Sequence, residues 1–185
     1  MHPFLTLQTH RLVLREITQD DAREIFEIYS CAEVVRYYDC DSYQGLQQAT
    51  NQIQAWAENC SKDVAIRWGI SEKGNGKIIG TCGFNFWNKQ YSASPLGYDL
   101  LPTYWNKRII TEAVTEILRF GFEVMKLNRV QAITFPENVA STRVLEKLCF
   151  QYEGTLREWG YFKGRFQDVY CYSLLRREWG HQNAK

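Results

Sequence analysis

The chain has 185 residues, enough for one domain with a full hydrophobic core that needs no metal or disulfide support. Its 22 basic and 21 acidic residues give a net charge of +1, which argues against an extended nucleic-acid-binding surface. Six cysteines without a C-x-x-C pair and only three histidines argue against a zinc site and are typical of reduced thiols in a cytoplasmic protein. No apolar run approaches the roughly 20 residues that cross a bilayer. We therefore predict one cytoplasmic domain, residues 1–185, that binds neither nucleic acid nor membrane.

The first third of the chain predicts one strand and two helices. Alternating apolar residues over 11–17 indicate a strand, and apolar residues at helical spacing indicate helices over 22–29 and 46–60. The segment 31–44 between these helices has no clean period. It predicts a loop with room for one helical turn.

A hairpin and a central strand follow. Residues 64–70 alternate as a strand, the glycine-containing stretch 73–77 predicts a turn, and 78–86 returns as the partner strand. After a connection over 87–95, the apolar run 96–101 predicts the central strand.

The second half predicts two helices and three more strands. A helix starts near Thr111 with an apolar stripe at Ile110, Ala113, Val114, Ile117, Leu118, Gly121 and Met125. A strand over 129–135 precedes a helix over 139–148 with Ala140, Val144, Leu145 and Leu148 inward, and a final hairpin pairs 156–163 with 166–175. This order predicts an α/β (α+β) fold with a mixed, mostly antiparallel sheet and helices on both faces.

The loop between the central strand and the next helix is a candidate anion site. The first N–H groups of a helix lack internal partners, and the helix dipole places partial positive charge there. Lys107 and Arg108 add two full charges at the same end. The alternative is an ordinary connection with two solvated cations, and spacing alone does not decide between them.

The residues of this stretch resemble a known family. Residues 98–113, Tyr-Asp-Leu-Leu-Pro-Thr-Tyr-Trp-Asn-Lys-Arg-Ile-Ile-Thr-Glu-Ala, are similar to the acetyl-CoA loop of GNAT N-acetyltransferases of the RimJ/RimL-like branch, which usually reads G-Y-x-L-x-P-x-Y-W-G-K-G-x-x-T-E-A. Further matches keep the family's order over nearly the whole chain: 9–15, 20–22, 138–150, 153–158 and 164–179. The resemblance implies the GNAT acyl-CoA N-acyltransferase fold. It also implies transfer of acetyl from acetyl-CoA to a primary amine, without a metal, by a monomer or homodimer.

The resemblance also implies where acetyl-CoA binds. The loop Trp105, Asn106, Lys107, Arg108, Ile109 and Ile110 would hold the pyrophosphate through main-chain N–H groups. Leu100 and Leu101 at the end of the central strand would pair with the pantetheine amides, and a main-chain N–H there would stabilise the oxyanion. Asn138 would hold the amide or thioester end of acetyl-CoA. Asn138 is also a good helix cap, and the two roles are compatible.

Three residues are candidates for moving protons. Many GNAT enzymes carry a Tyr seven residues after the position of Asn138, but Leu145 stands there, and the branch instead implies Ser141 as proton donor to the thiolate. Glu158, which strand alternation puts on the face of Leu156 and Gly160, is the first candidate for general base, and Asp99 is the second. The alternatives are a surface Ser in a first helical turn and ordinary acids on exposed strand faces, with bulk water taking the amine proton.

Three expected glycines are replaced, by Asn106, Arg108 and Cys149. Asn tolerates a positive φ better than most residues, whereas Arg there costs roughly 1–2 kcal/mol, which a direct guanidinium–phosphate contact would offset. The alternative function is therefore a catalytically weakened module that binds CoA or a protein partner.

The acceptor, a protein N-terminus or a small-molecule amine, is not fixed by these motifs. The loops 31–44 and 87–95 are predicted to wall its cleft, with Tyr37, Tyr38, Asp39 and Trp87 as candidate lining residues, or else to pack on the sheet.

Overall fold

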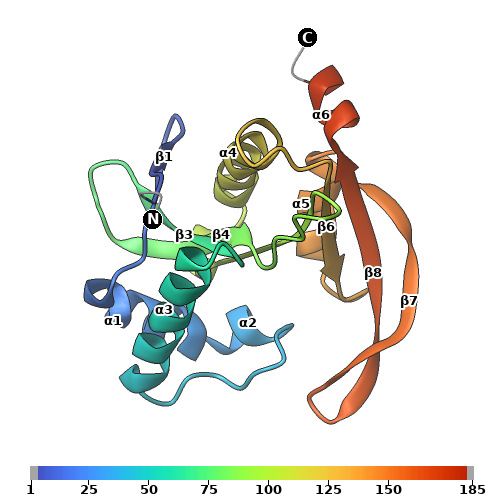
Figure 1. Cartoon of the computed structure of the whole chain (residues 1–185). Coiled ribbons are helices and arrows are strands. Elements are labelled where there is room, and N and C mark those ends of the chain that lie inside the picture. Colours follow the sequence, from blue (N-terminus) through green and yellow to red (C-terminus); the bar gives the residue numbers. More distant parts are fainter. Residues whose placement is uncertain (1–3, 183–185) are drawn as a thin grey trace.

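A computed structural model describes residues 4–182 (Figure 1). Its core is an eight-stranded sheet in the order β1-β2-β3-β4-β5-β6-β8-β7. The strands are β1 (Leu7–Gln8), β2 (Leu12–Arg15), β3 (Ile66–Glu72), β4 (Ile78–Phe84), β5 (Ala93–Leu100), β6 (Arg129–Thr134), β7 (Gln151–Phe162) and β8 (Arg165–Leu175). Every neighbouring pair is antiparallel except β5 and β6, so the predicted mixed, mostly antiparallel sheet is confirmed.

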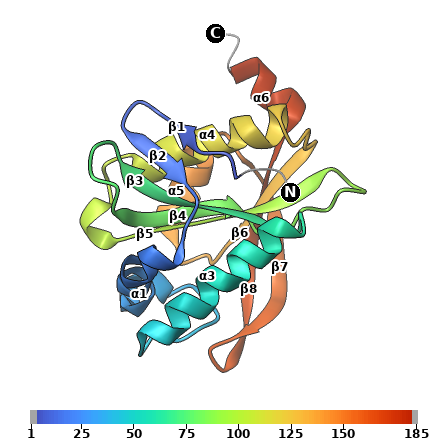
Figure 2. The same cartoon turned by 60° about the vertical axis from the view of Figure 1, so that its left-hand side comes forward.

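Helices cover both faces of the sheet, as predicted (Figure 2). They are α1 (Ala22–Ser30), α2 (Ala32–Val35), α3 (Leu46–Ser61), α4 (Ile109–Glu123), α5 (Val139–Lys147) and α6 (Arg176–Gln182). The α4 side forms the larger core around Trp68, Phe84 and Ile117, and the α1–α3 side forms a second core around Ile25, Ile53 and Ile78. None of the helices within residues 4–182 is long and apolar enough to cross a membrane.

The sheet divides in the middle. β5 and β6 pair only over Ala93–Pro95 and Arg129–Gln131. Beyond that point β5 continues with β4 to Leu100, while β6 continues with β8 to Thr134. The two halves of the sheet therefore turn away from each other (Figure 1), and a fork opens between the carboxyl ends of β5 and β6.

Several sequence-based boundaries need correction. α4 begins at Ile109 rather than near Thr111 and ends at Glu123, so Met125 lies beyond it. β5 begins at Ala93, inside the predicted 87–95 connection, because its first residues pair with β6. Ala140 is exposed rather than inward, and α6 and the short β1 were not predicted.

Candidate active site

The loop between β5 and α4 keeps a glycine-like backbone without its glycines. Asn106 has a φ of 61° and Arg108 a φ of 60°, both in the left-handed region. Arg108 is the residue that caps α4, and its side chain is exposed, as is that of Lys107. The main-chain N–H groups at the start of α4 and two cations therefore share one mouth, the geometry that binds phosphate. Arg108 therefore adopts the left-handed conformation although it is not a glycine.

A brace from the N-terminal strands holds this loop. Glu112, in the first turn of α4, accepts hydrogen bonds from the Thr9 hydroxyl (2.5 Å), the Arg11 amide (2.9 Å) and the Arg11 Nε (2.7 Å). The Arg11 Nη2 also donates to the carbonyl of Lys107, at 3.1 Å. Burial opposes ionisation of Glu112, but these hydrogen bonds outweigh it, so its pKa lies below the usual range. The loop before α4 is thus fixed from outside by residues about a hundred positions earlier.

The end of β5 points alternate main-chain groups into the fork. The amide of Leu101 donates to the carbonyl of Ile79 in β4, at 3.0 Å, which places the groups of alternate residues toward β4. The groups of Tyr98 and Leu100 therefore face the fork. The carbonyl of Leu100 accepts a hydrogen bond from the Trp105 indole Nε1, at 2.8 Å, which leaves the Leu100 amide as the donor aimed into the fork. Of the two residues expected here, Leu100 has the suitable orientation and Leu101 is committed to β4.

A hydroxyl pair lies across the fork. Asn138 caps α5, its Oδ1 accepting from the amide of Ser141 at 3.1 Å, so the cap role is observed directly. The Tyr98 hydroxyl lies 2.9 Å from Ser141 Oγ, with either atom able to donate, and it donates to the Ser141 carbonyl at 3.3 Å. Burial raises the pKa of Tyr98 above its ordinary value, so the phenol is protonated at neutral pH. Because side chains alternate along a strand, Tyr98 points to the face of β5 opposite that of Asp99. This alternation is the sequence signal by which Tyr98 could have been identified.

Asp99 lies on the opposite face of β5 in a buried polar cluster. Its carboxylate accepts five hydrogen bonds: from the hydroxyls of Tyr29 (2.7 Å), Tyr38 (3.2 Å) and Thr81 (2.9 Å), from Arg67 Nη2 (3.0 Å) and from the Thr81 amide (3.0 Å). The Arg67 side chain is 9% exposed and that of Asp99 2%. Burial raises the pKa of both tyrosines, which keeps them as donors. A carboxylate so fully engaged suits an anchor between the sheet and α1 better than a general base.

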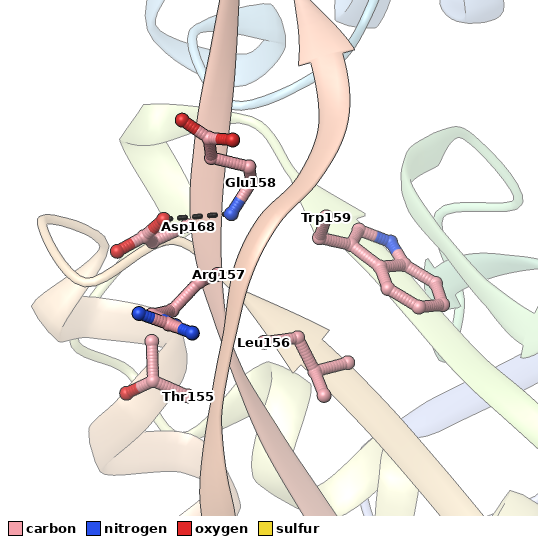
Figure 3. Close-up of a pocket in the computed structure, with 6 residues that line it drawn as sticks. All are labelled: Thr155, Leu156, Arg157, Glu158, Trp159 and Asp168. Atoms are coloured by element: carbon pink, nitrogen blue, oxygen red, sulfur yellow. Dashed lines mark hydrogen bonds between the residues drawn. The ribbon is translucent and has the colours of Figure 1, made fainter.

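Glu158 lies outside both clusters. It is exposed, has a φ of 49°, and its amide donates to Asp168 Oδ1 at 2.8 Å (Figure 3). The expectation from strand alternation, that Glu158 shares a face with Leu156, is wrong. The ladder places Leu156 opposite Val169 and Gly160 opposite Gln167, so β7 carries extra residues there, and Glu158 lies on the other side of the strand from Leu156 in Figure 3.

The two loops predicted to wall the acceptor cleft, 31–44 and 87–95, differ in what they contact. Tyr37 and Tyr38 line a cavity between α2, the end of β6 and the β7–β8 hairpin. Trp87 instead packs against the larger core, with Lys89 Nζ 4.8 Å from its ring centre. Asp39 is exposed. The alternative of simple packing therefore holds for Trp87, whereas the first loop lines a cavity.

Comparison with known proteins gives the same family as the motifs. The model described as "Acetyltransferase (GNAT) domain" matches residues 11–151. The chain is 36% identical to the uncharacterized N-acetyltransferase YoaA of Bacillus subtilis, covering 94% of this chain and 98% of that one. It is 38% identical to the uncharacterized N-acetyltransferase p20 of Bacillus licheniformis, with the same coverage. It is also 25% identical to the [ribosomal protein uS5]-alanine N-acetyltransferase of Escherichia coli, over 96% and 94% of the two chains.

Solved structures share the fold. A ribosomal L7/L12 alpha-N-protein acetyltransferase, RimL, in complex with coenzyme A superposes with a TM-score of 0.85. The match covers 92% of this chain and 98% of that one at 16% identity. This likeness confirms the GNAT architecture and leaves the acceptor open.

Proposed function

This chain belongs to the GNAT acetyltransferases, in the RimJ/RimL-like branch, as an acetyl-CoA-dependent N-acetyltransferase, and on that premise we propose that it acetylates an amine by direct attack on the thioester. The acceptor is a protein N-terminus or a small-molecule amine, and residues 1–185 act as one domain. The observation that supports this most strongly is the left-handed backbone at Asn106 and Arg108, because it keeps the phosphate-binding loop open despite the missing glycines.

Acetyl-CoA would bind along the fork. Main-chain N–H groups at the start of α4, with Lys107 and Arg108, would hold the pyrophosphate. The open edge of β5 from Tyr98 to Leu100 would pair with the pantetheine amides, as an added strand does. Asn138 has its Oδ1 engaged in capping α5, so its side-chain amide N–H group is the part that would meet the donor.

Acetyl transfer needs these residues to stabilise the oxyanion, to protonate the thiolate and to remove the amine proton. The neutral amine attacks the thioester carbonyl carbon, the oxyanion is stabilised by the Leu100 amide, and the carbon–sulfur bond then breaks. Ser141 gives its hydroxyl proton to the departing thiolate and is reprotonated by Tyr98, its neighbour at 2.9 Å, which takes a proton back from solvent and so restores the resting state. The amine proton leaves to solvent through Glu158, the remaining exposed candidate, because Asp99 is already saturated with donors.

A named relative supports a protein N-terminus as the acceptor class. The E. coli relative acts on the alanine of ribosomal protein uS5, and it aligns with nearly the whole of this chain. An amine at a chain end fits a site walled by a short loop and an exposed hairpin.

Two measurements test the proposal in sequence. Calorimetric titration with acetyl-CoA should show saturable binding, and thiol release with a panel of N-terminal peptides and small amines should identify an acceptor. Absence of binding at millimolar acetyl-CoA would overturn the proposal. Binding without turnover of any amine would favour the alternative, a module that holds CoA or a partner.

A further inference from the structure

The cavity lined by Tyr37 and Tyr38 lies next to the proposed reaction centre. It has a volume of about 300 Å³ and is lined by residues directly after α2, residues directly after β6, and the β7–β8 hairpin near its tip. In Figure 1 the hairpin tip and α2 lie at the same end of the molecule. Segments that are more than a hundred residues apart in the sequence therefore meet here.

One wall of the cavity is aromatic and fixed. The rings of Tyr37 and Phe135 stack with centres 5.8 Å apart, and Phe162 meets Phe135 edge-on at 5.1 Å. The Tyr37 hydroxyl donates to the carbonyl of Glu137, at 3.1 Å. These contacts give a preformed apolar surface on which the stem of a ligand can pack.

The rim of the cavity is cationic. Lys163 Nζ donates to the carbonyl of Val35 at 2.9 Å, which joins the hairpin tip to α2 and holds the ammonium in place. Arg36 lies over the Tyr37 ring at 5.3 Å, and Arg165 completes the group from β8. Against these three cations, the lining within the described chain carries one carboxylate, that of Glu137.

The cavity lies beside the fork. Glu137 directly precedes Asn138, the cap of α5, so the wall ends where the thioester is proposed to lie. Tyr38, also in the lining, donates to the carbonyl of Tyr98 at 3.4 Å as well as to Asp99. A group bound here would belong to the same molecule as the amine that enters the fork.

We propose that this cavity is an acceptor subsite for a carboxylate that the acceptor carries close to its amine. The inference rests on the proposed acetyl transfer and names the charge that the acceptor brings. Arg36, Lys163 and Arg165 supply the charge for recognition, and the aromatic wall packs the stem that carries the carboxylate. The carboxylate comes either from an Asp or Glu side chain just behind a protein N-terminus or from a free amino acid. The test separates these two sources.

The experiment uses the full chain with acetyl-CoA and follows thiol release. Three peptides share the same first residue and differ at the next two positions, which carry Glu, Gln or Lys. We expect kcat/KM for the Glu peptide to exceed that for the Gln peptide about tenfold, the equivalent of about 1.4 kcal/mol, with the Lys peptide poorest. Equal values for the Glu and Gln peptides would overturn the subsite and leave acetyl transfer standing.

Variants locate the preference. In Arg36→Gln and in Arg165→Gln the ratio of Glu-peptide to Gln-peptide kcat/KM should fall toward one. Arg177→Gln is the matched control, because Arg177 is an exposed arginine of α6 at the other end of the molecule (Figure 1) and loses the same charge. A ratio that persists in both cavity variants, or that falls equally in the control, would overturn the assignment.

Two further measurements identify the source of the carboxylate and separate the proposed subsite from the proposed acetyl transfer. A free amino acid is compared with its amide: a tenfold preference for the acid points to a small molecule, and a preference confined to peptides points to a protein N-terminus. If no amine is acetylated although acetyl-CoA binds, the proposed function fails. The subsite is then judged by fluorescence anisotropy of a labelled Glu peptide, whose binding must weaken in Arg165→Gln and not in Arg177→Gln.

Discussion

Tyr98 and Asp99 are neighbours in β5, and they lie in opposite kinds of surroundings. The Asp99 carboxylate accepts five hydrogen bonds, one of them from a buried arginine, so its capacity as an acceptor is filled. The Tyr98 hydroxyl meets Ser141 through hydroxyls that can exchange the donor role. The buried carboxylate therefore holds its partners in place, whereas the hydroxyl pair is the proton donor of the proposed mechanism. One strand thus provides an anchor on one face and the proposed chemistry on the other.

Asp99→Asn should have the largest effect and should act on stability. The variant leaves the Arg67 guanidinium buried without its counterion, which costs about 3–5 kcal/mol of unfolding free energy. Urea denaturation measures it. Asp168→Asn is the control, because that carboxylate is exposed. A loss of activity without a loss of stability would break the comparison and restore Asp99 as a candidate base.

Ser141→Ala should act on rate instead. Loss of a positioned proton donor lowers kcat by about 100-fold, while the unfolding free energy changes by less than about 1 kcal/mol. Steady-state thiol release and urea denaturation give the two numbers. Tyr98→Phe should lower kcat as well, and the double variant should be little worse than Ser141→Ala because the two hydroxyls act in one relay. Additive losses would contradict the relay.

Glu158→Gln sharpens the comparison by testing the other candidate base. We expect kcat/KM at neutral pH to fall about tenfold with no change in stability, because the side chain is exposed and tied to neither cluster. Steady-state thiol release gives the rate and urea denaturation the stability. An unchanged kcat/KM would mean that the amine proton passes directly to water.

Arg108→Gly tests the loop at the start of α4. An exposed guanidinium at this helix end should contact phosphate, so its removal weakens acetyl-CoA binding about tenfold, or about 1.4 kcal/mol, by calorimetry. The control for the lost charge is Arg23→Gln, on α1. It is preferred to Arg143→Gly, because a glycine at position 143 would disturb α5. Unchanged or tighter binding would mean that Arg108 merely tolerates the conformation.

The smallest effect concerns pH. Hydrogen bonds from Arg129 lower the pKa of Glu153 to about 2, below the ordinary value of 4.5. A lowered folded-state pKa contributes stability above pH 4.5, and that stability is lost as the pH falls toward 2. Because the Glu153 side chain is 39% exposed, the contribution is about 1 kcal/mol or less. Glu153→Gln should therefore lose less stability than the parent between these pH values in thermal denaturation, and a parallel loss would contradict it.

The sequence predicted elements better than it predicted their relations. Hydrophobic periodicity found α4 and the hairpins, and the family motif indicated the loop that we propose to bind phosphate, because both signals are local. Asp99 and Arg67 are 32 residues apart in the sequence, and Glu112 and Arg11 are 101 residues apart. Local residue spacing therefore did not indicate either contact. Glu158 was placed on the wrong face because the extra residues in β7 break a two-residue period that no local signal interrupts.

The fork has a consequence for the folded state itself. Past Pro95, the inner edge of β5 is a row of main-chain donors and acceptors without a neighbouring strand. A ligand whose own amides lined up along that row, as we propose for acetyl-CoA, would complete the sheet as a removable ninth strand. The protein's resistance to heat and proteolysis is then tied to cellular supply of acetyl-CoA, rising by about 2.7 kcal/mol when the free ligand is a hundred times its dissociation constant.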